Sequence, residues 1–136
     1  MTREMKLVLP ILFCIPPALL AHHSFAAEYD SAKTIKVQGT IQKLEWVNPH
    51  AYFWVEAKDE SGKSVVYAFE TLSPNALARQ GWNRKSLVPG EQVTVEGYLA
   101  KDGKPLSDGS IHANSRLVTR VNGAKVFVGS SADNEK

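Results

Sequence analysis

The feature that most constrains the fold is a succession of short strand-like runs, separated by turn residues, that begins at Lys36. β-branched and aromatic residues dominate the runs. Gly, Pro, Asn and Asp gather between them, at 48–49, 58–63, 89–90, 101–104 and 122–123. Short strands with turn signals about every 8 to 12 residues are typical of a β-sandwich or a β-barrel. We therefore expect an all-β domain over residues 36–128.

The first run contains a change of phase. Val37, Gly39 and Ile41 alternate on one face, whereas Leu44 and Trp46 continue at the opposite parity. A slip of one residue within a single apolar run is what a β-bulge produces, and a bulged strand bends. A bent first strand could belong to both sides of a barrel.

A short helix interrupts the strands after the third run. Ser73 is suited to the N-cap, Pro74 to the first helical position, and Gly81 to the position just past the end. Five to six strands with one short helix between the third and fourth are the order of the OB-fold, a five-stranded Greek-key barrel. A small open sandwich is the competing architecture.

The N-terminus has the pattern of a secretory signal. Arg3 and Lys6 precede an apolar run over 7–20, which reaches the small residues Ala18 and Ala21. For cleavage after Ala21, Leu19 stands at a position where a small residue is preferred. The run of 14 residues is shorter than the roughly 20 that a membrane-spanning helix needs, so a retained anchor is the weaker alternative. We predict a signal peptide at 1–21, an extended lead-in at 22–35, an OB-like β-barrel at 36–128 and a disordered tail at 129–136. The protein is then exported, to the periplasm or beyond the cell, without stable membrane insertion after cleavage.

Charge and cysteine content exclude several classes of function. Without residues 1–21, the chain keeps 14 Lys and Arg against 13 Asp and Glu, which is not the basic patch of a nucleic-acid-binding protein. The only cysteine, Cys14, lies in the predicted signal, so we expect no disulfide and no thiolate ligand in the mature chain. No known catalytic motif is present, which disfavours an enzyme.

Three histidines suggest a metal site. Cleavage after Ala21 would leave His22 and His23 at the new N-terminus, where the α-amino group and the imidazole of His22 can chelate one ion together. Imidazole suits copper, zinc and nickel, and copper(II) generally binds most tightly. His50, in the turn Asn48-Pro49-His50, could complete the site.

Other interpretations of these histidines stay open. Cleavage after Ala27 would remove both His22 and His23, although Ala21 directly follows the apolar run. The histidines could instead be structural or incidental, or take part in acid–base chemistry. His112 belongs to a late strand, far along the chain from the others, and is not included in the site.

Aromatic residues offer a second hypothesis. Tyr52 and Trp54 share one face of the second run, and together with Asn48 and Trp82 they could bind a peptide, a glycan or an envelope protein. The alternative is that these rings fill the barrel and cover its ends. The carboxylates Glu45, Glu56, Glu70 and Glu96 lie mostly at parities that predict a solvated face.

Several strings resemble a family of small exported bacterial proteins classed as a domain of unknown function. They are HHSFAAEYD at 22–30, EWVNPH at 45–50, SPN at 73–75, GW at 81–82 and PGEQVTVEG at 89–97. The likeness runs from about Ala21 to Phe127, and Thr34 departs from it, because proline often follows the lysine there. The resemblance implies a periplasmic or secreted location and makes His22, His23 and His50 motif residues. It implies no activity.

Overall fold

The computed structural model describes residues 25–129. The predicted signal at 1–21, His22 and His23, and residues 130–136 of the predicted tail lie outside this range. No helix in the described range is both long enough and apolar enough to cross a membrane.

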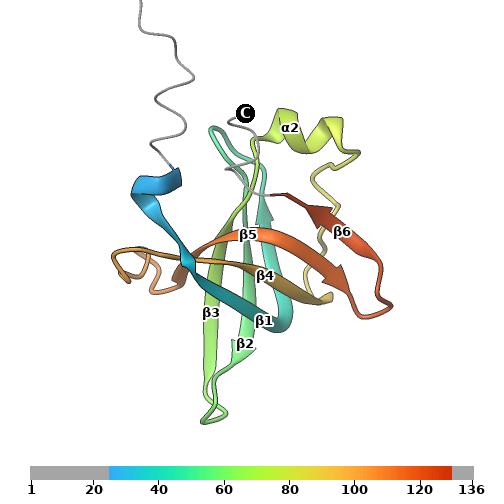
Figure 1. Ribbon diagram of the computed structural model, residues 1–136. Coiled ribbons are helices and arrows are strands. Elements are labelled where there is room, and N and C mark those ends of the chain that lie inside the picture. Colours follow the sequence, from blue (N-terminus) through green and yellow to red (C-terminus); the bar gives the residue numbers. More distant parts are fainter. Residues whose placement is uncertain (1–24, 130–136) are drawn as a thin grey trace, which may run out of the picture.

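Within residues 25–129, six strands and one short helix follow a helical turn at residues 25–28 (Figure 1). In chain order they are β1 (Tyr29–Glu45), β2 (Tyr52–Lys58), β3 (Ser64–Glu70), α2 (Pro74–Arg79), β4 (Gln92–Ala100), β5 (Ile111–Arg120) and β6 (Lys125–Val128). Within 22–35, where the sequence predicts an extended lead-in, the helical turn leads directly into β1.

The first five strands close into a barrel. The hydrogen-bonded order is β3-β2-β1-β4-β5-β6, and a parallel pairing of β3 with β5 joins the two sides. β6 adds a further strand beside β5, after the turn that Asn122-Gly123 predicts. With α2 between β3 and β4, this arrangement confirms the predicted OB-like barrel.

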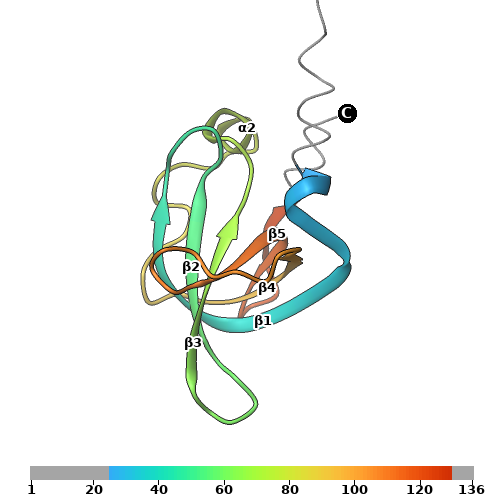
Figure 2. The same ribbon diagram turned by 90° about the vertical axis from the view of Figure 1, so that its left-hand side faces the viewer.

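β1 is bent and serves both sides of the barrel, curving around it in Figure 2. Its first part pairs with β4 and its second part with β2, and the register with β2 shifts between Ile41 and Lys43. This shift confirms the bulge predicted from the change of parity. Gly39 pairs on both sides, and a Cβ there would lie 2.2 Å from the carbonyl oxygen of Glu56, so only glycine fits.

The hydrophobic core lies inside the barrel and is completed by α2. Phe53 and Phe69 from β2 and β3 are fully buried and stack on each other, with ring centroids 5.4 Å apart. Leu77 of α2 joins the same core. The helix begins as predicted, because the Ser73 hydroxyl accepts a hydrogen bond from the Ala76 amide at 3.2 Å.

Candidate metal centre

Polar side chains converge where β1, β2 and β5 begin and β3 ends. Antiparallel pairing of β2 with β3 sets Tyr52 opposite Glu70. Parallel pairing of β3 with β5 sets His112 beside Ala68, two residues before Glu70. Tyr29, the first residue of β1, reaches the same place through its hydroxyl group. Barrel closure therefore brings together side chains from four strands.

Glu70 lies at the centre of this cluster and is only 4% exposed. One carboxylate oxygen, Oε1, accepts a hydrogen bond from Nδ1 of His50. The other, Oε2, accepts hydrogen bonds from the hydroxyl groups of Tyr29 and Tyr52, the latter at 3.0 Å. These donors offset the cost of burying a carboxylate.

The burial of Glu70 corrects the expectation of a solvated face for this residue. The last three residues of β3, Ala68 to Glu70, are all buried, so the strand does not alternate there. The reason is that this end of β3 is paired on both edges, with β2 and with β5, and side chains of the cluster cover its outer face.

The local charge is reflected in the pKa values. Burial raises the pKa of Glu70, but the hydrogen bonds from His50 and Tyr29 outweigh it, so the net pKa is below the usual value and the group is ionised. Burial first, and then the negative charge of Glu70, raises the pKa of Tyr29, of Tyr52 and of Glu28. The centre is thus an anionic site with protonated tyrosines.

His112 contributes a second imidazole, with a side chain 11% exposed. Its Nε2 lies 2.8 Å from the Tyr29 oxygen and 4.0 Å from Oε2 of Glu70. Because the single hydroxyl hydrogen of Tyr29 goes to Glu70, the Nε2–H of His112 is the donor to the Tyr29 oxygen. The predicted site did not include His112 because it lies far along the chain from the other histidines. No local sequence pattern predicts the parallel pairing of β3 with β5 that brings it to Glu70.

The cluster has the donor set of a metal site. Ligand atoms of Glu28, Glu70 and His112 all lie within 4.8 Å of one another. Carboxylate oxygen and imidazole nitrogen are common ligands of divalent transition metals. The His50–Glu70 hydrogen bond has the form of the carboxylate–histidine pairs that orient metal ligands, in which one ring nitrogen donates to the carboxylate. We call Glu28, Glu70 and His112 the metal cluster.

A family model of unknown function (DUF6152) matches residues 11–109. The chain belongs to this family. The match confirms the resemblance drawn from the sequence and includes every residue of the cluster except His112, which lies three residues beyond its end. No curated protein and no solved structure shows significant similarity to this DUF6152 chain.

The helical turn at 25–28 of this DUF6152 protein is held beside the metal cluster. The Phe25 ring packs 5.4 Å from the ring of Tyr29 and 5.9 Å from that of Tyr98, measured between centroids. The Lys101 amide donates a hydrogen bond of 2.9 Å to the Glu28 carbonyl oxygen. The described chain therefore begins next to the cluster.

The other residues predicted to form a site have separate positions. Trp54 is only 7% exposed, its indole N–H donates to Asp108 at 2.9 Å, and the Lys43 ammonium lies 3.8 Å from its ring centroid. Trp82 belongs to the hydrophobic core and donates to the Val126 carbonyl at 2.9 Å. Asn48 is exposed in the turn before His50. Of the predicted site residues within 25–129, only His50 and Tyr52 contact the metal cluster, through their hydrogen bonds to Glu70.

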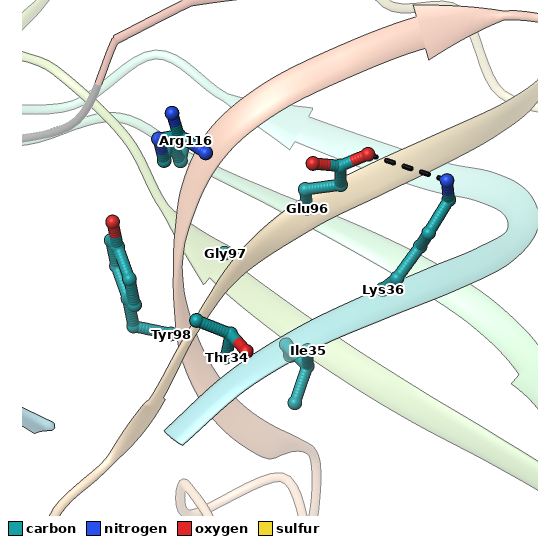
Figure 3. A pocket seen from close by; sticks show the side chains of 7 residues that line it. All are labelled: Thr34, Ile35, Lys36, Glu96, Gly97, Tyr98 and Arg116. Atoms are coloured by element: carbon teal, nitrogen blue, oxygen red, sulfur yellow. Dashed lines mark ion pairs between the residues drawn. The ribbon is translucent and has the colours of Figure 1, made fainter. Parts of the chain in front are cut away.

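A hollow of about 420 Å³ lies on the outer face of β1, β4 and β5 (Figure 3). Lys36 and Glu96 form an ion pair of 3.4 Å across it, in which the Lys36 side chain is exposed and the Glu96 side chain is partly exposed to solvent. Such an ion pair adds little stability and needs no ligand to complete it. The buried charge of Glu70 is the stronger indication of a site, so we place the candidate centre there.

Proposed function

We propose that this protein is exported to the periplasm, or secreted, and binds a transition-metal ion, with copper(II) as the ion. Glu28, Glu70 and His112 supply ligands, and His50, His22 and His23 are further candidates. The observation that carries the proposal is that ligand atoms of two carboxylates and an imidazole lie within 4.8 Å of one another, and that one of these carboxylates belongs to the buried Glu70. The role is ion handling rather than turnover.

The electrostatics of the cluster support a cation. Within residues 25–129, the side-chain contacts of Glu70 come from histidines and tyrosines, and none from Lys or Arg. The pKa of the neighbouring Glu28 is raised, first by desolvation and next by the charge of Glu70. Two carboxylates that repel each other gain free energy when a divalent cation binds between them.

Chain connectivity supports a role for the N-terminal histidines. His23 lies two residues before Phe25, and an extended chain covers about 3.3–3.6 Å per residue. Phe25 packs on Tyr29, whose hydroxyl contacts both Glu70 and His112. A mature chain that starts at His22 would therefore have its α-amino group and both imidazoles within reach of the metal cluster.

The alternative of a metal-free module for a peptide, a glycan or an envelope protein has less support. It depends on open aromatic faces at Tyr52 and Trp54. Trp54 is nearly buried and lies under Lys43, and the Tyr52 hydroxyl is engaged with Glu70. Little of the Trp54 ring is therefore left for a partner.

The test uses the whole precursor, expressed in a bacterial host and recovered from the periplasm. Intact mass identifies the first residue, for which we expect His22, and calorimetry measures copper(II) binding. We expect one ion per chain with a dissociation constant in the micromolar range or below. Glu70→Gln should weaken binding by about 100-fold or more, because a charged ligand is lost. Glu96→Gln, a change of the same kind on a partly exposed strand residue outside the metal cluster, should bind like the wild type.

Two results would count against the proposal in different ways. If the folded wild-type protein does not bind copper(II), zinc(II) or nickel(II) at micromolar concentrations, the proposed metal site is wrong. A mature chain that starts after His23 would remove the N-terminal ligands but leave the metal cluster to be judged by titration.

A further inference from the structure

The Tyr29 hydroxyl lies between the two metal-cluster side chains that are most buried. Its oxygen is hydrogen-bonded to Oε2 of Glu70 and lies 2.8 Å from Nε2 of His112, while these two ligand atoms are 4.0 Å apart. Metal bonds to such atoms are about 2.0–2.2 Å long. An ion shared by Glu70 and His112 would therefore lie within bonding distance of the Tyr29 oxygen.

We infer that Tyr29 is itself a ligand of the ion, through its phenolate oxygen. This inference rests on the proposed function and names one more ligand of that site. In the metal-free protein, the Tyr29 hydroxyl hydrogen and the His112 Nε2 hydrogen occupy the space between the ligand atoms. On binding, the metal–oxygen bond replaces the O–H bond and the phenol proton is released to solvent, while His112 moves its ring hydrogen to Nδ1.

Packing explains why Tyr29 would bind the ion instead of moving aside. The side chain is 2% exposed, and its ring lies 5.4 Å from that of Phe25 and 5.2 Å from that of His112. Its backbone is fixed by pairing with Ala100 of β4. Turning the ring out of this position would expose apolar surface and remove one of the hydrogen bonds that the buried Glu70 accepts, both of which cost free energy.

Tyr52 provides a matched control. It also donates to Glu70, at 3.0 Å, but it meets His112 through ring stacking, at 6.2 Å between centroids. Its oxygen therefore supports the carboxylate without standing between Glu70 and His112. A phenolate, a carboxylate and an imidazole form a hard to borderline donor set, which favours copper(II) or iron(III) over copper(I).

The experiment is a copper(II) titration of the full exported protein, followed by visible absorption and by calorimetry. Copper(II)–phenolate bonds give a charge-transfer band in the visible range. We expect this band in the wild type and in Tyr52→Phe. Tyr29→Phe should lose the band and bind copper(II) about 10- to 100-fold more weakly. Circular dichroism checks that each variant folds.

Resonance Raman spectra of the wild type, excited within the band, provide a measurement that needs no variant, and tyrosinate ring modes are expected. A wild-type protein that binds copper(II) without the band, or a Tyr29→Phe variant that keeps it, would overturn the ligand role and leave the proposed function standing. Absence of binding by calorimetry would overturn both.

Discussion

Two carboxylates, Glu70 and Glu91, each join distant parts of the chain, but their partners differ. Glu91 pairs with the Arg120 guanidinium, which also donates to the Ser86 carbonyl at 2.9 Å. Glu70 is held by imidazole and phenol groups, with two contacts from tyrosines and two from histidines. The Glu91 pair is partly exposed, with side-chain exposures of 20% for Glu91 and 37% for Arg120, whereas Glu70 is buried.

The difference in partners distinguishes a structural ion pair, at Glu91, from a site that could bind a metal ion, at Glu70. Arg120 has a permanent positive charge and no lone pair to offer a metal ion. Its ion pair with Glu91 therefore neutralises the carboxylate without a further ligand. Histidine and tyrosine can exchange a hydrogen for a metal ion, so the partners of Glu70 can also be partners of a cation. The two regions therefore predict opposite responses to substitution.

The largest effect should come from removing the buried carboxylate. Glu70→Ala leaves three donors, on Tyr29, His50 and Tyr52, without an acceptor, and we expect a loss of about 3–5 kcal/mol in the free energy of unfolding. Urea denaturation of the metal-free protein measures it. A loss below 1 kcal/mol would show that water replaces the carboxylate and that the cluster is not an ordered network.

A second substitution gives Glu70 an arginine as a neighbour, which is the kind of partner that Glu91 has. His112→Arg places a permanent positive charge beside Glu70 and should lower copper(II) affinity by about 100-fold or more, because it removes a ligand and occupies the cation position. Calorimetry measures the affinity, and a melting curve verifies folding. Retention of wild-type affinity would mean that His112 is not a ligand.

The role of His50 should appear as a smaller effect. Its Nδ1 hydrogen bond orients the Glu70 carboxylate, so His50→Ala should weaken copper(II) binding by about 10- to 100-fold while leaving one ion per chain. Asn48→Ala, in the same turn but exposed, is the matched control and should bind like the wild type. Equal losses in both variants would indicate a change in the turn instead of in the site.

The smallest effect should come from the partly exposed pair of Glu91 and Arg120. Glu91→Gln should cost about 1 kcal/mol or less in the free energy of unfolding, because partly solvated ion pairs contribute little. Copper(II) affinity should not change. A loss as large as that of Glu70→Ala would remove the distinction between the two carboxylates.

The local elements of the barrel were predictable because their signals are local. The change of parity after Ile41 predicted the bulge, Ser73 and Pro74 predicted the start of α2, and Asn122-Gly123 predicted the turn before β6. Each depends on the backbone preferences or the alternation of a few neighbouring residues. His50 could also be chosen as a candidate, because a histidine in a turn is visible in the sequence.

The composition of the centre depends on the closed barrel. Alternation assigns Glu70 to a solvated face, but the end of β3 pairs on both edges and the side chains that these pairings bring over Glu70 bury it. His112 is separated from Glu70 by 42 positions in the chain and reaches it through a parallel pairing. The order of the short strands and the helix is encoded locally, so it can be inferred from the chain alone. The burial of Glu70 and its contact with His112 depend on pairing between distant strands, which exists only in the folded barrel.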